Sequence, residues 1–143
     1  MSADAVSTAP APPKRYVLGV VRFLMGLAFT VFGLNGFIHF IPEPKTPMAK
    51  AVTDLMGAMM ATGYMFPLVF GTQLLGGVLL LLNIFVPLGL VLLMPVLVHI
   101  LAFHIWLQPA GIGPGAVLMA FELYLAWCYR KCFYPMLAFR VRP

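Results

Sequence analysis

The feature that most constrains this chain is a long stretch without charge. Residues 55–121 contain no Asp, Glu, Lys or Arg, and residues 64–106 form one apolar run of 43 residues. As a single straight helix this run would extend ~65 Å, about twice the ~30 Å thickness of the hydrocarbon core of a bilayer. It must therefore fold back, and the asparagine and proline in NIFVP (residues 83–87) favour a turn there. The sequence predicts two spans, at about residues 64–84 and 86–106.

Composition places the chain among integral membrane proteins. Of its 143 residues, 62% are hydrophobic and 9% are charged, whereas a soluble domain carries about 25% charged residues. The net charge of +5 does not indicate nucleic-acid binding, because no basic–aromatic strip is present. Basic residues instead flank the apolar segments, as the positive-inside bias produces. They are Lys14, Arg15, Arg130, Lys131, Arg140 and Arg142.

The remaining apolar segments complete the predicted architecture. Residues 17–41 and 116–133 are long enough to form a first and a fourth span. We expect an all-α, polytopic membrane four-helix bundle over residues 16–134, with both termini cytoplasmic. Residues 1–15 are expected to form a disordered cytoplasmic tail and residues 135–143 a basic one.

A short interfacial helix is expected between spans one and two, at about residues 47–60. Thr46 can cap such a helix and Pro47 can open it. Apolar residues recur on one side at helical spacing, while Lys50 and Asp54 form an i,i+4 pair on the other side. The helix therefore reads as amphipathic, lying in the outer interface.

Small and polar residues on span one are predicted to face protein rather than lipid. Arg22, Gly26 and Gly33 fall on one face of the helix, and small residues there let a neighbouring helix approach closely. Arg22 either extends to the cytoplasmic headgroups or pairs with an anion or with Glu122. At the outer end, Asn35 and His39 form either a polar pair at the helix terminus or the wall of an outward-facing polar pocket.

Spans two and three carry further polar candidates. Gln73 shares a face with Gly77, and Gly76 adjoins that face, which indicates close helix packing with an interhelical hydrogen bond. His99 and His104 are five residues apart, so they point about 140° apart and a metal site from these two residues is not expected. We expect one buried histidine, His99 on the Pro95 face, either as a packing residue or as a proton relay and headgroup ligand.

Glu122 is the only acid of span four and the strongest functional candidate. A buried carboxylate is costly unless it is paired or protonated. Glu122 is therefore expected to act as a proton carrier, as a hydrogen-bond partner, or as a structural partner of Arg22 or a histidine. Cys128 and Cys132 lack the C-x-x-C spacing and are interpreted as packing thiols.

Four short spans with a loop helix after the first resemble the DoxX family of small bacterial membrane proteins, over about residues 16–133. Two motifs carry the resemblance, Arg22-x3-Gly26-x2-Phe29-x3-Gly33 and Gln73-x2-Gly76-Gly77-x2-Leu80. Many members carry a glutamate at the position of Gln73. The family takes its name from a subunit linked to thiosulfate:quinone oxidoreduction, so the resemblance implies a redox-associated subunit of the bacterial inner membrane.

Two functional hypotheses follow. The first is an accessory subunit of a redox or energy-converting membrane complex, docked on a larger membrane-protein partner or on a second copy through glycine-lined faces. The second is a quinone-binding oxidoreductase subunit with an intramembrane polar pocket. That pocket would be formed by Arg22, Gln73, His99 and Glu122, with Glu122 and His99 as the catalytic candidates. A small transporter is a third class, for which no internal repeat is evident.

Overall fold

The computed structural model describes residues 12–42 and 45–137. All regular secondary structure in this part of the chain is helical. The six α-helices are α1 (Pro12–Ile38), α2 (Lys50–Ala61), α3 (Met65–Leu82), α4 (Val86–Trp106), α5 (Ile112–Cys128) and α6 (Arg130–Phe133). Two short 3₁₀ segments, η1 (Pro109–Gly111) and η2 (Tyr134–Leu137), follow α4 and α6.

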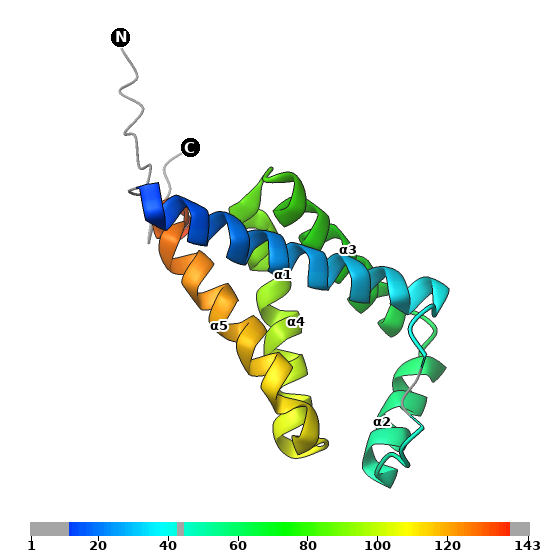
Figure 1. The fold of residues 1–143 in the computed structure, drawn as a ribbon. Coiled ribbons are helices and arrows are strands. Elements are labelled where there is room, and N and C mark those ends of the chain that lie inside the picture. The colour runs from blue at the N-terminus through cyan, green and yellow to red at the C-terminus, as the bar shows by residue number, and fades with distance from the viewer. Residues whose placement is uncertain (1–11, 43–44, 138–143) are drawn as a thin grey trace.

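Four long helices form the bundle, and the predicted all-α fold is confirmed. Helix α1 packs along α3, α3 packs on α4, α4 packs on α5, and α5 returns to contact α1. Figure 1 shows the four helices with the start of α1 beside the end of α5 at one end of the bundle. The core between them is apolar and includes Met25, Phe29, Leu80, Leu93 and Leu125.

The same four helices are long and apolar enough to cross a bilayer, so the chain is a multi-pass membrane protein. Large apolar side chains cover their outer surfaces as well as their inner ones. Leu68 is 60% exposed, Leu82 61% and Val98 53%. In water such a surface would drive aggregation, whereas in a membrane it contacts lipid tails.

Helix α1 is shifted toward the N-terminus relative to the predicted span of residues 17–41. It begins at Pro12, so residues 12–15 of the expected tail are helical, which fits the tolerance of proline in a first turn. It ends at Ile38 because His39 adopts the left-handed conformation, with φ of 48°. Residues 1–11 and 138–143, which include most of both expected tails, lie outside the described residues.

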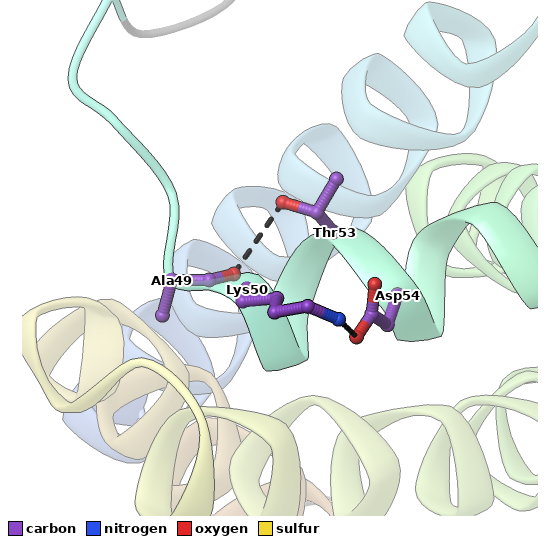
Figure 2. A network of polar contacts seen from close by, with 4 residues as sticks. All are labelled: Ala49, Lys50, Thr53 and Asp54. Carbon is purple, nitrogen blue, oxygen red and sulfur yellow. Dashed lines mark hydrogen bonds and ion pairs between the residues drawn. The ribbon is translucent and has the colours of Figure 1, made fainter.

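The predicted helix between spans one and two exists, but its predicted start is wrong. Helix α2 begins at Lys50 with Ala49 as its N-cap and no side-chain cap, so neither Thr46 nor Pro47 opens it. Figure 2 shows its first turn, where the Thr53 hydroxyl donates to the Ala49 carbonyl oxygen across 3.4 Å. The exposed Lys50 and Asp54 form the expected ion pair at 2.6 Å. Figure 1 shows α2 projecting from the bundle below the junction of α1 and α3.

The hairpin between α3 and α4 lies where the sequence predicts it. Asn83 ends α3 in the left-handed conformation with φ of 56°, and the Ile84 N–H bonds to the Leu79 carbonyl across 3.1 Å. This six-to-one bond is the Schellman motif, in which asparagine can replace glycine. Pro87 then lies in the first turn of α4. Backbone N–H groups in a first turn have no carbonyl of the same helix to bond, so the N–H that proline lacks costs no helical hydrogen bond there.

Helix α5 begins earlier and ends earlier than the predicted span of residues 116–133. The 3₁₀ segment η1 comes directly before α5, which starts at Ile112 and accommodates Pro114 within its first turn. At the other end, Tyr129 breaks the helix before the short α6.

Candidate functional site

Glu122 lies on the inner side of α5 and is the most deeply buried acid in the described chain. Its exposed fraction is 1%, and no hydrogen-bond partner is found for its Oε2 atom. The ion pair found between described residues, Lys50 with Asp54, lies on α2 and outside the bundle. An unpartnered polar group in an apolar interior costs free energy, which makes Glu122 the first candidate for a functional residue.

Glu122 is one of the residues that line a groove between α4 and α5. The groove has a volume of about 390 Å³ and is partly open to the outside of the bundle. Its lining is apolar apart from Glu122 and consists of Leu90, Val91, Met94, Pro95, Glu122, Ala126 and Phe133. An apolar cleft of this size with one directional polar group has the general character of a small-molecule site.

Arg22 does not pair with Glu122, so that predicted alternative is wrong. Its Nη1 atom donates to Oδ1 of Asn83 across 2.6 Å, which ties α1 to the left-handed cap of α3. The Arg22 Nε atom is buried and has no hydrogen-bond partner among the described residues. Arg22 therefore fixes the hairpin end of the bundle and lies outside the lining of the groove.

The expected burial of His99 is also wrong. His99 is exposed on α4, so it faces away from the core and does not line the groove. His104 is the partly buried histidine instead, with its ring against Gly111 and its Nδ1 3.1 Å from the Gln108 carbonyl oxygen. Two side chains five residues apart on a helix point about 140° apart around its axis. When one of the two histidines faces the bundle, the other therefore faces the lipid.

Gln73 is buried on α3, with 6% exposed, but it does not line the groove. The four residues predicted to share one pocket are therefore separated, and Glu122 alone lies at the groove between α4 and α5.

The predicted packing glycines lie at close helix contacts. A Cβ atom on Gly26 would come within 2.9 Å of the Leu81 nitrogen, and one on Gly33 within 2.6 Å of the Leu74 nitrogen, so α1 and α3 touch through their backbones. A Cβ on Gly77 would approach the Thr30 nitrogen to 2.6 Å.

Gly76, on α3, faces α4. A Cβ atom there would meet Leu93 of α4 at 2.6 Å, and one on Gly89 would meet the Leu80 side chain at 2.5 Å. Sequence reasoning missed Gly89, whose only signal is a glycine within an apolar helix. It also missed Asn83 as the partner of Arg22, because 61 residues separate the two in the chain.

Asn35 and His39 form a helix terminus. The Asn35 side-chain oxygen accepts a hydrogen bond from the Ile41 N–H at 2.7 Å, and the Asn35 carbonyl accepts from the His39 N–H at 2.8 Å. These bonds satisfy backbone groups that the end of α1 leaves open. The geometry favours the terminal polar pair over the wall of an outward-facing pocket.

Within residues 12–42 and 45–137, no group of three or more metal-ligating side chains is found. Cys128 and Cys132 are free thiols at the exposed end of α5 and on α6.

No family model, no curated protein and no solved structure matches this chain. The resemblance to the DoxX family therefore stays a prediction from its motifs.

Proposed function

We propose that this protein is an accessory subunit of a redox or energy-converting membrane complex, and that it contributes a binding groove for a quinone-type molecule. The observation that carries this proposal is Glu122, whose buried Oε2 atom has no hydrogen-bond partner among the described residues, in the lining of the groove between α4 and α5. The DoxX-like motifs of spans one and two support the redox context.

The groove fits the two parts of such a molecule. Its side chains, such as Leu90 and Met94, are suited to an isoprenoid tail. Glu122 supplies the one side chain in the lining that can hydrogen-bond a headgroup oxygen. When bound, a quinone would supply the electron chemistry, while Glu122 would orient the headgroup and hold or accept a proton there.

Binding can be followed with the native tryptophans. Trp127 adjoins Ala126 of the groove lining, so a short-chain quinone bound there should quench its fluorescence. In nanodiscs we expect saturable quenching for the natural chain, loss of saturation for Glu122→Leu, and no change for Leu123→Ala, which alters an exposed side chain of the same helix. Equal, non-saturable quenching in all three proteins would show only partitioning of the quinone into lipid.

A second candidate is a subunit that only packs against partners. It is favoured by the lateral opening of the groove, because a partner helix carrying a basic residue could cover Glu122 and pair with it. Native mass spectrometry of the protein released gently from its own membranes separates the two. Larger subunits without a quinone-sized adduct would support packing alone, whereas an adduct lost in Glu122→Leu would support the groove.

We also propose that the end of the bundle holding the α3–α4 hairpin faces the cytoplasm of a bacterial cell. Four described basic residues flank the spans at this end, namely Lys14, Arg15, Arg130 and Lys131. The α4–α5 connection at the other end is uncharged. Gly113, in the first turn of α5 directly after that connection, has open space around it. In cells that carry the protein with Cys128 and Cys132 replaced by serine, Gly113→Cys should react with a membrane-impermeant maleimide added outside the cells. Labelling that occurs only after the cells are lysed would indicate the opposite orientation.

A further inference from the structure

The first turns of α1 extend past the end of α3. The two helices are antiparallel, and near this end they meet at Gly26, where an added Cβ atom would lie 2.9 Å from the Leu81 nitrogen. Helix α3 ends one residue later, at Leu82, whereas α1 begins as far back as Pro12. Figure 1 shows these first turns running beyond the α3–α4 hairpin. The face of α1 that packs on α3 therefore continues beyond the last residue of α3.

This continuation is open and carries two arginines. Gly19, Gly26 and Gly33 are seven residues apart, so they lie on one face of α1. Cβ atoms on Gly26 and Gly33 would meet the backbone of α3, but one on Gly19 would meet nothing within 4 Å among the described residues. Arg15 and Arg22 lie four residues before and three after Gly19, which places them on the same side of the helix, ~10 Å apart along its axis. We call Arg15, Gly19 and Arg22 the open face of α1.

The guanidinium group of Arg22 has no anionic partner among the described residues. Its Nη1 atom donates to Oδ1 of Asn83 at 2.6 Å, and this acceptor is a neutral amide. A guanidinium carries five N–H donors, so a single neutral acceptor satisfies neither its hydrogen bonds nor its charge. The side chain is half-buried, and a cation partly removed from water needs an opposite charge. Asn83 is exposed, and its amide nitrogen supplies two further donors beside Arg22.

Other basic side chains surround the open face. Lys14, Arg130 and Lys131 are exposed at the same end of the bundle, where the start of α1 lies beside the end of α5 (Figure 1). The acids within the described ranges do not neutralise them, because Asp54 pairs with a lysine of its own helix α2 and Glu122 is buried in the bundle. This end therefore presents a positive field at the level of lipid headgroups.

We propose that the open face of α1 binds the phosphate group of an anionic phospholipid. The phosphate would lie over Gly19, where no side chain stands in its way, and accept hydrogen bonds from Arg15 and Arg22. Guanidinium groups bind phosphate oxygens through two parallel hydrogen bonds, which an ammonium group cannot do. The lipid would thus supply the counter-charge that the protein does not give Arg22. The site lies apart from the groove between α4 and α5, and it does not depend on the ligand of that groove.

Filling the open face without changing its charge is the decisive test. Gly19→Leu places a side chain where the phosphate would lie, and it should not prevent folding, because its Cβ atom meets nothing and leucine is favoured over glycine in a helix. Gly71→Leu is the matched control, since Gly71 of α3 is equally free of contacts. The measurement is native mass spectrometry of the delipidated protein in a neutral detergent, titrated with phosphatidylglycerol or with phosphatidylcholine of the same chain length.

We expect the natural chain and Gly71→Leu to bind the first phosphatidylglycerol about tenfold more tightly than the first phosphatidylcholine. In Gly19→Leu this preference should be lost. Arg22→Gln should lose it too, whereas Arg130→Gln should keep it. The second of these removes the same charge at the same end of the bundle, from a side chain that instead bonds to the Trp127 carbonyl at 2.9 Å.

Three results would overturn the proposal. Equal affinity of the natural chain for the two lipids would remove the preference itself. A preference kept in Gly19→Leu would place the lipid elsewhere on the protein. Equal losses in Arg22→Gln and Arg130→Gln would show attraction to the whole basic end and no defined site. Inorganic phosphate added to the titration should not displace the lipid, and displacement at millimolar concentration would assign the site to a free anion.

Discussion

Replacing Gly77 with alanine should push α1 and α3 apart, and these two helices share the most extensive contact in the bundle. The added Cβ atom would lie 2.6 Å from the Thr30 nitrogen, 2.7 Å from the Thr30 hydroxyl oxygen and 2.9 Å from the Gly26 carbonyl oxygen. Two of these three atoms belong to the backbone of α1, so no side-chain rotation relieves the overlap. Helix α1 must instead shift by several tenths of an ångström, which loosens its packing against α3.

The magnitude follows from two opposing effects. Overpacking a close contact costs ~1–3 kcal/mol, and a backbone-to-backbone contact belongs at the upper end because it cannot relax locally. Alanine is favoured over glycine in a helix by about 1 kcal/mol. The net destabilisation expected for Gly77→Ala is therefore about 2 kcal/mol.

Gly71→Ala provides the matched control on the same helix. A Cβ atom at Gly71 meets nothing within 4 Å, so this variant gains the helix preference without the overlap. Unfolding in mixed micelles, followed by circular dichroism and tryptophan fluorescence, should place the two variants on opposite sides of the natural chain. They should differ by about 3 kcal/mol, the overpacking cost itself. Equal stability of the two would refute the backbone contact between α1 and α3.

Substitutions at three further positions test the site and the hairpin in the same unfolding assay. Glu122→Leu should stabilise the ligand-free protein by ~1–3 kcal/mol, because it removes an unpartnered buried polar group; destabilisation would reveal a structural partner. Asn83→Gly should lose only the bond to Arg22, whereas Asn83→Ala should be less stable by a further ~1 kcal/mol because alanine disfavours the left-handed cap; similar losses would argue against that backbone strain. Phe85→Gly should stabilise the hairpin by ~1 kcal/mol, since Phe85 is 73% exposed at φ of 46°; a loss of stability would mean that its ring anchors the hairpin in lipid.

The spans and the turn between α3 and α4 could be predicted because their causes are local. Hydropathy over about twenty residues sets whether a helix can cross the bilayer, and Asn83 ends α3 by its own backbone preference. Errors arose where two local signals compete. Thr46 and Pro47 resemble a helix start, yet α2 begins three residues beyond Pro47 without a side-chain cap.

What the sequence by itself determined is therefore the membrane class, the four helices, the short helix α2, and the presence of a costly acid on the last span. Only the tertiary structure decided what those residues face. It turned His99 outward, joined Arg22 to Asn83, and placed Glu122 at a groove with Pro95. In water, an apolar stripe marks the inner face of a helix. In a bilayer the lipid side is as apolar as the core, so the rotation of each helix depends on packing with its neighbours, which periodicity does not reveal.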